Sequence, residues 1–279
     1  ADLLRRLASR LNKPLIFVHR GYDLPAFVDV KTLVIASSYS GNTEETLSTF
    51  TQALDINCKK LAITTGGKLK TLAQERKIPV FTIDYLSQPR AALGYSFIPL
   101  IALLGKLGFT EDKSAAPTPP LRAKRSNLTV QALPALVEET AQLLEGLLGQ
   151  IAENIPASLN PAKQLASKLS GKLVVIYGAG ILSPVAQRWK GQFNENSKTW
   201  AFYETFSELN HNAVVGYEFP PEMAGRVYVI LLRCPSLHPR TLTRYQITCE
   251  VLAKACAVEA SSDSQGESNL AQMMSSVFL

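Results

Sequence analysis

Short apolar runs alternate with helix-like stretches in the first half of the chain. The strand-like runs PLIFV, TLVIA, KLAIT and VFTI occupy residues 14–18, 32–36, 60–64 and 80–83. Between them, EETLSTFTQAL (44–54) and LKTLAQER (69–76) place their apolar residues at helical spacing. Strands that alternate with helices in this way predict a parallel sheet with helices on its faces.

The second half repeats this alternation. Its predicted helices are 135–151, 161–170, 183–194 and 241–255, and its predicted strands are 172–177, 199–203 and 227–232. The two halves can be aligned so that helices match helices and strands match strands. Their sequence identity is weak, but the order of the elements is the same. The pattern therefore predicts two α/β/α three-layer subdomains with mainly parallel sheets.

The overlay leaves one unit of the second half without a counterpart. KLVVIYGAG (172–180) opens the second sheet, and its partner in the first half would lie before Ala1. We therefore expect a first subdomain over 1–109 that lacks its opening strand. A proline-rich linker follows over 110–127, and a second subdomain covers 128–279.

Composition and charge narrow the function classes. Hydrophobic residues are 46% and charged residues 19%, so a disordered chain is excluded. The net charge of +6 is too diffuse to indicate nucleic acid binding, and the basic cluster in the linker is read as solvated. The longest apolar run, FIPLIALL (97–104), is too short to span a bilayer. Four widely spaced cysteines indicate neither a disulfide scaffold nor a zinc ribbon, and a reducing cytoplasm is the simplest compartment.

The strongest local signal is SSYSGNTEET (37–46), which links a predicted strand to a predicted helix. Ser38, Ser40 and Thr43 place three hydroxyls around the helix start, where unpaired N–H groups and the helix dipole favour an anion. The alternative is an ordinary helix cap, which needs one hydroxyl rather than three. We therefore favour a phosphate site. It is not a Walker loop, because no Gly-Lys-Ser/Thr follows.

Two other patterns carry less weight. GAG at 178–180 lacks the third glycine of a dinucleotide fingerprint and is explained by a close strand-to-helix turn. The three histidines are isolated and form no HxxxH or HExxH pair, so no zinc site is predicted.

Several sequence blocks carry a family resemblance. SSYSGNTEET resembles the signature loop of the sugar isomerase (SIS) domains. RWKGQFNENSKTWAF (188–202) and FSELNHNAVVGY (206–217) closely resemble the catalytic region of the bifunctional phosphoglucose/phosphomannose isomerases. QPRAALGYSF (88–97) and HRGYDLP (19–25) resemble two further blocks, in the family's order.

The resemblance implies roles for individual residues. Ser38, Ser40 and Thr43 match the phosphate ligands, Glu195 the catalytic base and His211 the ring-opening residue. Arg90 matches an active-site arginine. The implied activity is reversible isomerisation of glucose 6-phosphate and mannose 6-phosphate with fructose 6-phosphate, without metal or organic cofactor. The family is dimeric, and its histidine reaches the partner subunit's site.

Two alternatives remain. A non-catalytic SIS module that senses a phosphosugar would need the hydroxyl loop but neither Glu195 nor His211. A glutamine-dependent aminosugar synthase is disfavoured because no N-terminal cysteine domain is present. The family pattern also extends before Ala1 and past Leu279, to a helix with an active-site lysine. Residues 1–279 are therefore expected to be a fragment that is unstable and inactive on its own.

Overall fold

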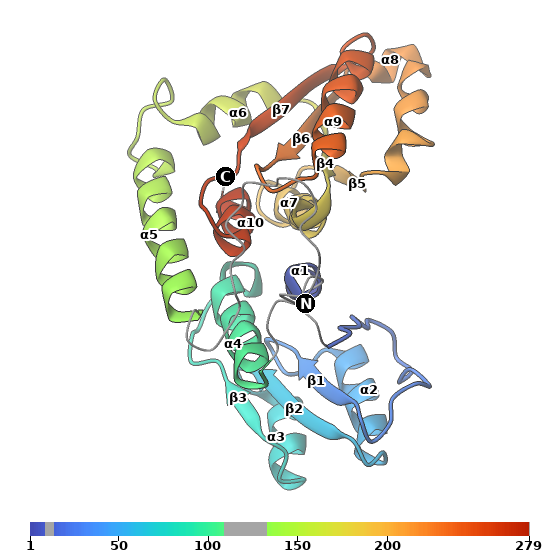
Figure 1. Ribbon diagram of the computed structural model, residues 1–279, viewed down its shortest axis with the longest axis vertical. Helices are drawn as coiled ribbons and strands as arrows, with labels where there is room; N and C mark the ends of the chain where they lie inside the picture. Colours follow the sequence, from blue (N-terminus) through green and yellow to red (C-terminus); the bar gives the residue numbers. More distant parts are fainter. Residues whose placement is uncertain (9–13, 109–132, 279) are drawn as a thin grey trace. The chain divides into compact units, whose positions relative to one another are not determined.

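The computed structural model describes residues 1–8, 14–108 and 133–278 (Figure 1). The chain divides into two compact units. One consists of Leu15–Leu107 together with Ala1, and the other of Asp2–Pro14 and Gly108–Leu279. The predicted linker at 110–127 lies outside the described residues.

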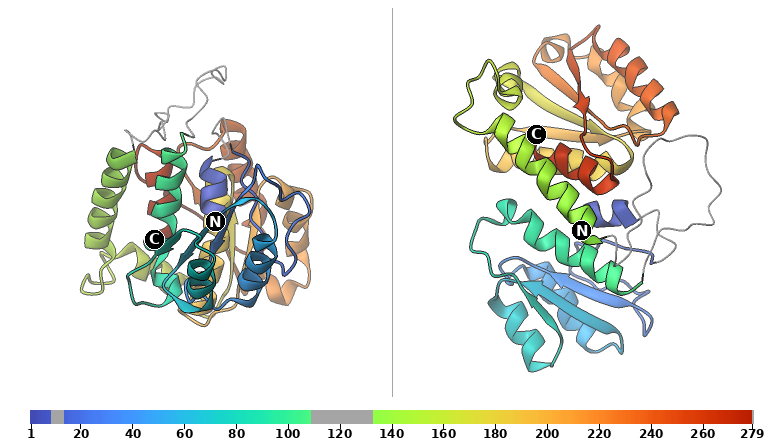
Figure 2. Two further views of the ribbon diagram at one scale, coloured as in Figure 1. Left: turned by 90° about the horizontal axis from the view of Figure 1, so that it is seen from below. Right: turned by 60° about the vertical axis from the view of Figure 1, so that its left-hand side comes forward.

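The first unit is built on a three-stranded parallel sheet in the order β1-β2-β3. The helices α2 and α3 lie on one face of this sheet, and α4 crosses the other (Figure 2). Ala36, Ala62 and Phe50 are buried in the core between the sheet and the first two helices. In chain order the elements are β1 (Leu33–Ser37), α2 (Glu44–Leu54), β2 (Lys59–Thr64), α3 (Gly67–Glu75), β3 (Val80–Thr82), the 3₁₀ turn η2 (Pro89–Ala91) and α4 (Leu93–Lys106).

The second unit is built on a four-stranded parallel sheet in the order β5-β4-β6-β7. The chain passes outward from β4 to β5 and, on the other side, from β6 to β7. Right-handed crossovers therefore place α7 and α9 on opposite faces. Its helices are α1 (Asp2–Leu7), α5 (Leu133–Ile151), α6 (Pro161–Leu169), α7 (Ser183–Glu195), α8 (Pro221–Ala224), α9 (Pro239–Leu252) and α10 (Asn269–Phe278). Its strands and 3₁₀ turns are β4 (Leu173–Gly178), η3 (Gly180–Leu182), β5 (Ala201–Thr205), η4 (Glu208–Asn210), η5 (Ala213–Glu218), β6 (Val227–Arg233) and β7 (Ala257–Asp263).

The helix α10 is buried along most of its length although four of its ten residues are polar. Its polar side chains bond within the fold: Ser275 Oγ accepts from Gln265 N–H at 3.0 Å, and Ser276 Oγ pairs with Ser264 Oγ. Glu139 on α5 accepts the backbone N–H groups of Glu267 and Ser268 at 3.0 and 3.1 Å. That carboxylate fixes α5 at the turn that leads into α10, because it supplies acceptors and negative charge next to a helix start.

The predicted fold class is confirmed, since both sheets are parallel and carry helices. The strand predicted at 14–18 is wrong. This segment forms no ladder, and the side chains of Leu15 and Phe17 are 97% and 59% exposed. Strand-forming residues become a strand only beside a partner, and in the described part of the chain β1 pairs with β2 alone.

The N-terminal helix also differs from its predicted place. It was expected in the first subdomain, but α1 groups with the second unit. Leu3, Leu4 and Leu7 are buried. Arg6 Nε donates to the carbonyl of Gly180 at 2.7 Å. An apolar helix face with its own hydrogen bond to η3 explains this grouping.

Candidate active site

The turn between β1 and α2 brings the predicted phosphate ligands together. The Oγ of Ser38 lies 2.8 Å from the Oγ1 of Thr43, and Ser40 Oγ accepts from Asn42 N–H at 3.2 Å. Thr43 is the N-cap residue of α2, yet its hydroxyl makes no cap bond. Its hydroxyl pairs with Ser38 instead, so no described side chain caps the first turn of α2. The backbone N–H groups at an uncapped helix start can bind an anion.

A second turn, between β2 and α3, holds the first one in shape. Asn42 Oδ1 accepts from Lys68 N–H at 3.1 Å, and the carbonyl of Gly41 accepts from Leu69 N–H at 2.9 Å. Gly41 has φ +69°, and a Cβ there would lie 1.9 Å from the carbonyl oxygen of Gly66. Only glycine fits this close approach. The first turn thus closes the start of α3 while the start of α2 stays uncapped.

Sequence reasoning missed this second turn. Thr64 and Thr65 both donate side-chain hydroxyls to the carbonyl of Tyr39, at 3.3 and 2.7 Å. The available signal was TTGG (64–67) at the carboxyl end of a predicted strand. Carboxyl ends of neighbouring parallel strands meet at one sheet edge, so the two turns are expected to adjoin.

Two carboxylates stand in the first turn of α2. Glu44 accepts a hydrogen bond from the Tyr22 hydroxyl at 3.3 Å, and Ser48 Oγ and Gln52 Nε2 both donate to the Tyr22 carbonyl at 2.8 Å. These contacts dock the HRGYDLP block on α2. The two carboxylates interact favourably with the positive end of the helix dipole, but they repel an anion bound at the same helix end.

Arg90 belongs to the same unit as the turn between β1 and α2. It stands in η2, half-buried, and its Nη1 lies 3.4 Å from the Oε1 of Gln88. The carbonyl of Gln88 also accepts from Ala91 N–H at 2.9 Å, and Ala92 is fully buried. The backbone around Arg90 is therefore fixed by its own turn.

Glu195 is the last residue of α7 and is exposed. Burial lowers the pKa of the Arg188 guanidinium two turns earlier on α7, and the charge of Glu195 opposes that shift. The carboxylate therefore acts electrostatically on a cation of its own helix. Lys198 Nζ donates to the Glu195 carbonyl at 2.7 Å, and Asn194 Nδ2 donates to the Thr199 carbonyl at 2.8 Å. These bonds hold the end of α7 beside the approach to β5.

His211 is exposed and lies between η4 and η5. Its neighbours are anchored, because Asn210 Nδ2 donates to Thr248 Oγ1 at 3.0 Å and Asn212 Nδ2 to Glu208 Oε1 at 3.2 Å. The end of α7 precedes β5 and His211 follows it. The five residues of β5 span roughly 15 Å, so Glu195 and His211 lie toward opposite ends of one strand.

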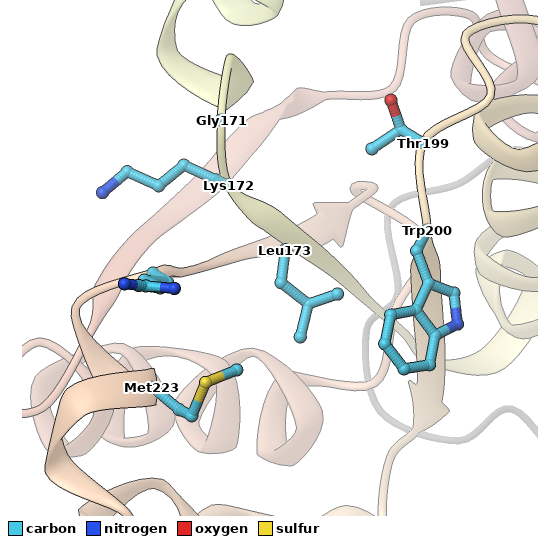
Figure 3. Close-up of a pocket in the computed structure, with 7 residues that line it drawn as sticks. Gly171, Lys172, Leu173, Thr199, Trp200 and Met223 are labelled. Atoms are coloured by element: carbon cyan, nitrogen blue, oxygen red, sulfur yellow. The ribbon is translucent and has the colours of Figure 1, made fainter.

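A hollow of about 290 Å³ opens at the amino ends of β4, β5 and β6 (Figure 3). It is lined by Gly171, Lys172, Leu173, Thr199, Trp200, Met223 and Arg226, and includes none of the predicted site residues. Because no predicted site residue lines it, this hollow is not the predicted site. Within the described ranges no group of three or more His, Cys, Asp or Glu side chains could hold a metal ion. No described helix is long and apolar enough to cross a membrane.

Comparison with known proteins identifies the family. Residues 158–279 match the family described as the bacterial phospho-glucose isomerase C-terminal SIS domain. In the solved structures, the chain resembles a glucose-6-phosphate isomerase like protein from Thermus thermophilus, with a TM-score of 0.58 at 14% identity, over 94% of this chain and 83% of that one. The C-terminal domain of glucosamine-fructose-6-phosphate aminotransferase from Francisella tularensis gives 0.59 at 14%, over 92% and 71%. These two likenesses concern the fold alone.

Curated relatives are closer in sequence. The bifunctional phosphoglucose/phosphomannose isomerase of Caldicellulosiruptor bescii is 42% identical over all 279 residues, which cover 76% of that protein. The Aquifex aeolicus protein of the same name is 32% identical over 96% of this chain and 73% of its own length. A D-glucosamine-6-phosphate 4-epimerase of Sulfolobus acidocaldarius is 31% identical over 68% of this chain and 52% of its own. The family predicted from the sequence blocks is confirmed: the chain belongs to the bifunctional phosphoglucose/phosphomannose isomerases.

Proposed function

We propose that this protein interconverts glucose 6-phosphate and mannose 6-phosphate with fructose 6-phosphate. The observation that carries the proposal is the uncapped start of α2, where the Thr43 hydroxyl turns to Ser38. An anion there would receive backbone N–H groups, a helix dipole and three hydroxyls. The names of the two relatives that share most of this chain support the choice of sugar phosphates.

Glu195 is the proposed base. Conversion of an aldose to its ketose moves a proton from C2 to C1 through a cis-enediol. A single carboxylate suffices, since it takes the proton from C2 and returns it to C1. Its exposed position at the end of α7 leaves the carboxylate open to substrate. One base serves both epimers if the open chain rotates about C2–C3.

Arg90 is proposed to stabilise the charge that develops on O1 and O2 of the enediol. A fixed guanidinium does this with little reorganisation during the reaction. The phosphate, held by Ser38, Ser40 and Thr43, keeps the reacting carbons in register with the base. Neither role needs a metal or an organic cofactor.

His211 is the proposed ring-opening residue, and we propose that it acts in the partner's site of a homodimer. An imidazole suits this step because its ordinary pKa lies near neutrality. Support comes from the position of Glu195 and His211 toward opposite ends of β5. In such a dimer each copy would supply its histidine to the glutamate of its partner.

The test is a coupled assay of the full-length protein with both aldose phosphates. Glu195→Gln keeps the shape of the side chain but removes the proton acceptor. Both activities should fall together by at least about a hundredfold, the scale of a lost general base. The matched control is Glu222→Gln, a neutralised exposed carboxylate on α8, which should leave both activities unchanged.

Two results would contradict the proposal. Activity that survives Glu195→Gln on either sugar assigns the base elsewhere. A wild-type protein that binds fructose 6-phosphate but turns over neither aldose phosphate is a phosphosugar-binding module instead.

A further inference from the structure

Tyr39 stands in the phosphate turn between Ser38 and Ser40, but its side chain serves another segment. Its hydroxyl donates to the carbonyl of Tyr85 and accepts the backbone N–H of Ser87 at 2.9 Å. These partners lie more than forty residues along the chain, as the sequence separations of 46 and 48 show. One phenol therefore closes a bridge between the phosphate turn and the segment that leads to Arg90.

The turn end of this bridge is fixed. The carbonyl of Tyr39 accepts three hydrogen bonds: from Thr65 N–H at 3.0 Å, from Thr65 Oγ1 at 2.7 Å and from Thr64 Oγ1 at 3.3 Å. A backbone held by three donors from the end of β2 does not swing with its side chain. The Tyr39 hydroxyl therefore holds Tyr85 and Ser87 at a set distance from the phosphate turn.

The arginine end is fixed as well. The Tyr85 ring stacks on Tyr95 of α4, with centroids 4.2 Å apart and planes 10° from parallel. Only Gln88 and Pro89 separate Ser87 from Arg90, and η2 with the buried Ala92 makes that stretch stiff. A shift at Ser87 is therefore passed to the guanidinium.

From this geometry we infer that Tyr39 is a positioning residue, which sets Arg90 relative to the phosphate turn through its hydrogen bonds to Tyr85 and Ser87. The inference rests on the proposed function, in which the turn holds the phosphate and Arg90 faces the other end of the sugar. A positioned cation stabilises developing charge only at the right distance, so a small displacement lowers the rate more than it lowers binding.

The test is a double-mutant cycle on the full-length protein with Tyr39→Phe, Arg90→Ala and the combination. Tyr39→Phe should lower kcat about tenfold but leave the inhibition constant of inorganic phosphate within about twofold, because phosphate uses the turn alone. In the Arg90→Ala background the same change should lower kcat less than about twofold, since no guanidinium remains to be placed. The control is Tyr95→Phe, which keeps the stacked ring and whose hydroxyl bonds to no other described residue.

Additive losses in the cycle would overturn the inference, as would an equal loss of kcat and phosphate binding, because both are the marks of general damage to the turn. A second readout does not depend on turnover. Hydrogen exchange of 85–91 should accelerate in Tyr39→Phe while exchange within 44–54 stays unchanged. Unaltered exchange in 85–91 contradicts the inference, whether or not the wild type is active. A wild type without isomerase activity counts against the proposed function alone.

Discussion

The two units each carry a turn from a parallel strand to a helix, and the two turns differ in what closes the helix. After β1, Thr43 leaves the start of α2 without a side-chain cap. After β6, the Nδ1 of His238 accepts the N–H of Arg240 at 3.1 Å, and Pro239 at the first helical position of α9 has no N–H to offer. The same topology therefore makes an open helix start in one unit and a closed one in the other.

The difference shows that a strand-to-helix turn in a parallel sheet does not by itself leave a helix start open. Both turns stand at the carboxyl end of a strand, where α/β folds bind ligands. Whether the helix start is open depends on whether the N-cap side chain accepts a hydrogen bond from its own helix. Ser38 diverts Thr43 in the first turn, whereas the corresponding loop of the second turn buries Cys234 and Ser236 against each other at 3.4 Å.

The largest effect is expected from the glycine that locks the open turn. Gly41→Ala places a Cβ 1.9 Å from the carbonyl oxygen of Gly66, and the φ of +69° at this position is one that alanine rarely adopts. We expect a loss of roughly 3 kcal/mol or more in the free energy of unfolding, because strain and a clash add together. Thermal and urea unfolding measure it.

The matched control for that change is Gly149→Ala on α5, where a Cβ meets nothing within 4 Å. Alanine in a helix should stabilise by a few tenths to about 1 kcal/mol. If Gly41→Ala is as stable as this control, the close approach between the two turns is not real.

Next in size is the loss of hydroxyls from the open turn. Ser40→Ala and Thr43→Ala each remove one group from the proposed phosphate site. A hydrogen bond to a charged group contributes about 1.5–3 kcal/mol, so KM for the sugar phosphates should rise about tenfold or more. The value of kcat should change much less, because the phosphate is remote from the transferred proton. Steady-state kinetics separate the two, and an unchanged KM in both variants would make this turn an ordinary connection.

The smallest effect is expected at the closed turn. His238→Ala removes the cap of α9 and should lower the free energy of unfolding by about 1 kcal/mol. It should leave KM for sugar phosphates unchanged, because this turn is not proposed to hold phosphate. Denaturant unfolding and the same kinetic assay check both halves, and a raised KM would contradict the contrast between the turns.

The amino-acid pattern predicts regular elements well where burial repeats with a fixed period. The helix predicted at 44–54 is α2 with the same bounds, and β4 and β6 lie within a residue of their predicted ends. The pattern fails where a neighbouring strand or a distant hydrogen-bond partner determines the structure of a segment. PLIFV at 14–18 has strand residues but no neighbour, and β7 is built from the small and polar AVEASSD. The helix α10 buries four polar residues beside its apolar ones, and Ser275 and Gln272 make hydrogen bonds inside the unit that no local pattern predicts.

The candidate site shows the same limit. The hydroxyls clustered at a helix start are visible in SSYSGNTEET because they lie close together in the sequence, between Ser38 and Thr43. The bridge from Tyr39 to Ser87 joins residues 48 positions apart, and no local pattern announces it. Family resemblance supplied Glu195 and His211, and the structure places them before and after β5 along the chain.

The division of labour between the units is tested most directly by binding without turnover. Calorimetric titration of fructose 6-phosphate into full-length Glu195→Gln should give the wild-type affinity, because this change removes the proposed base and leaves the proposed phosphate turn intact. The same titration into Ser38→Ala/Thr43→Ala should give an affinity at least about tenfold weaker, on the scale of lost hydrogen bonds to a charged group. Weak binding by Glu195→Gln together with wild-type binding by the double variant would contradict the account.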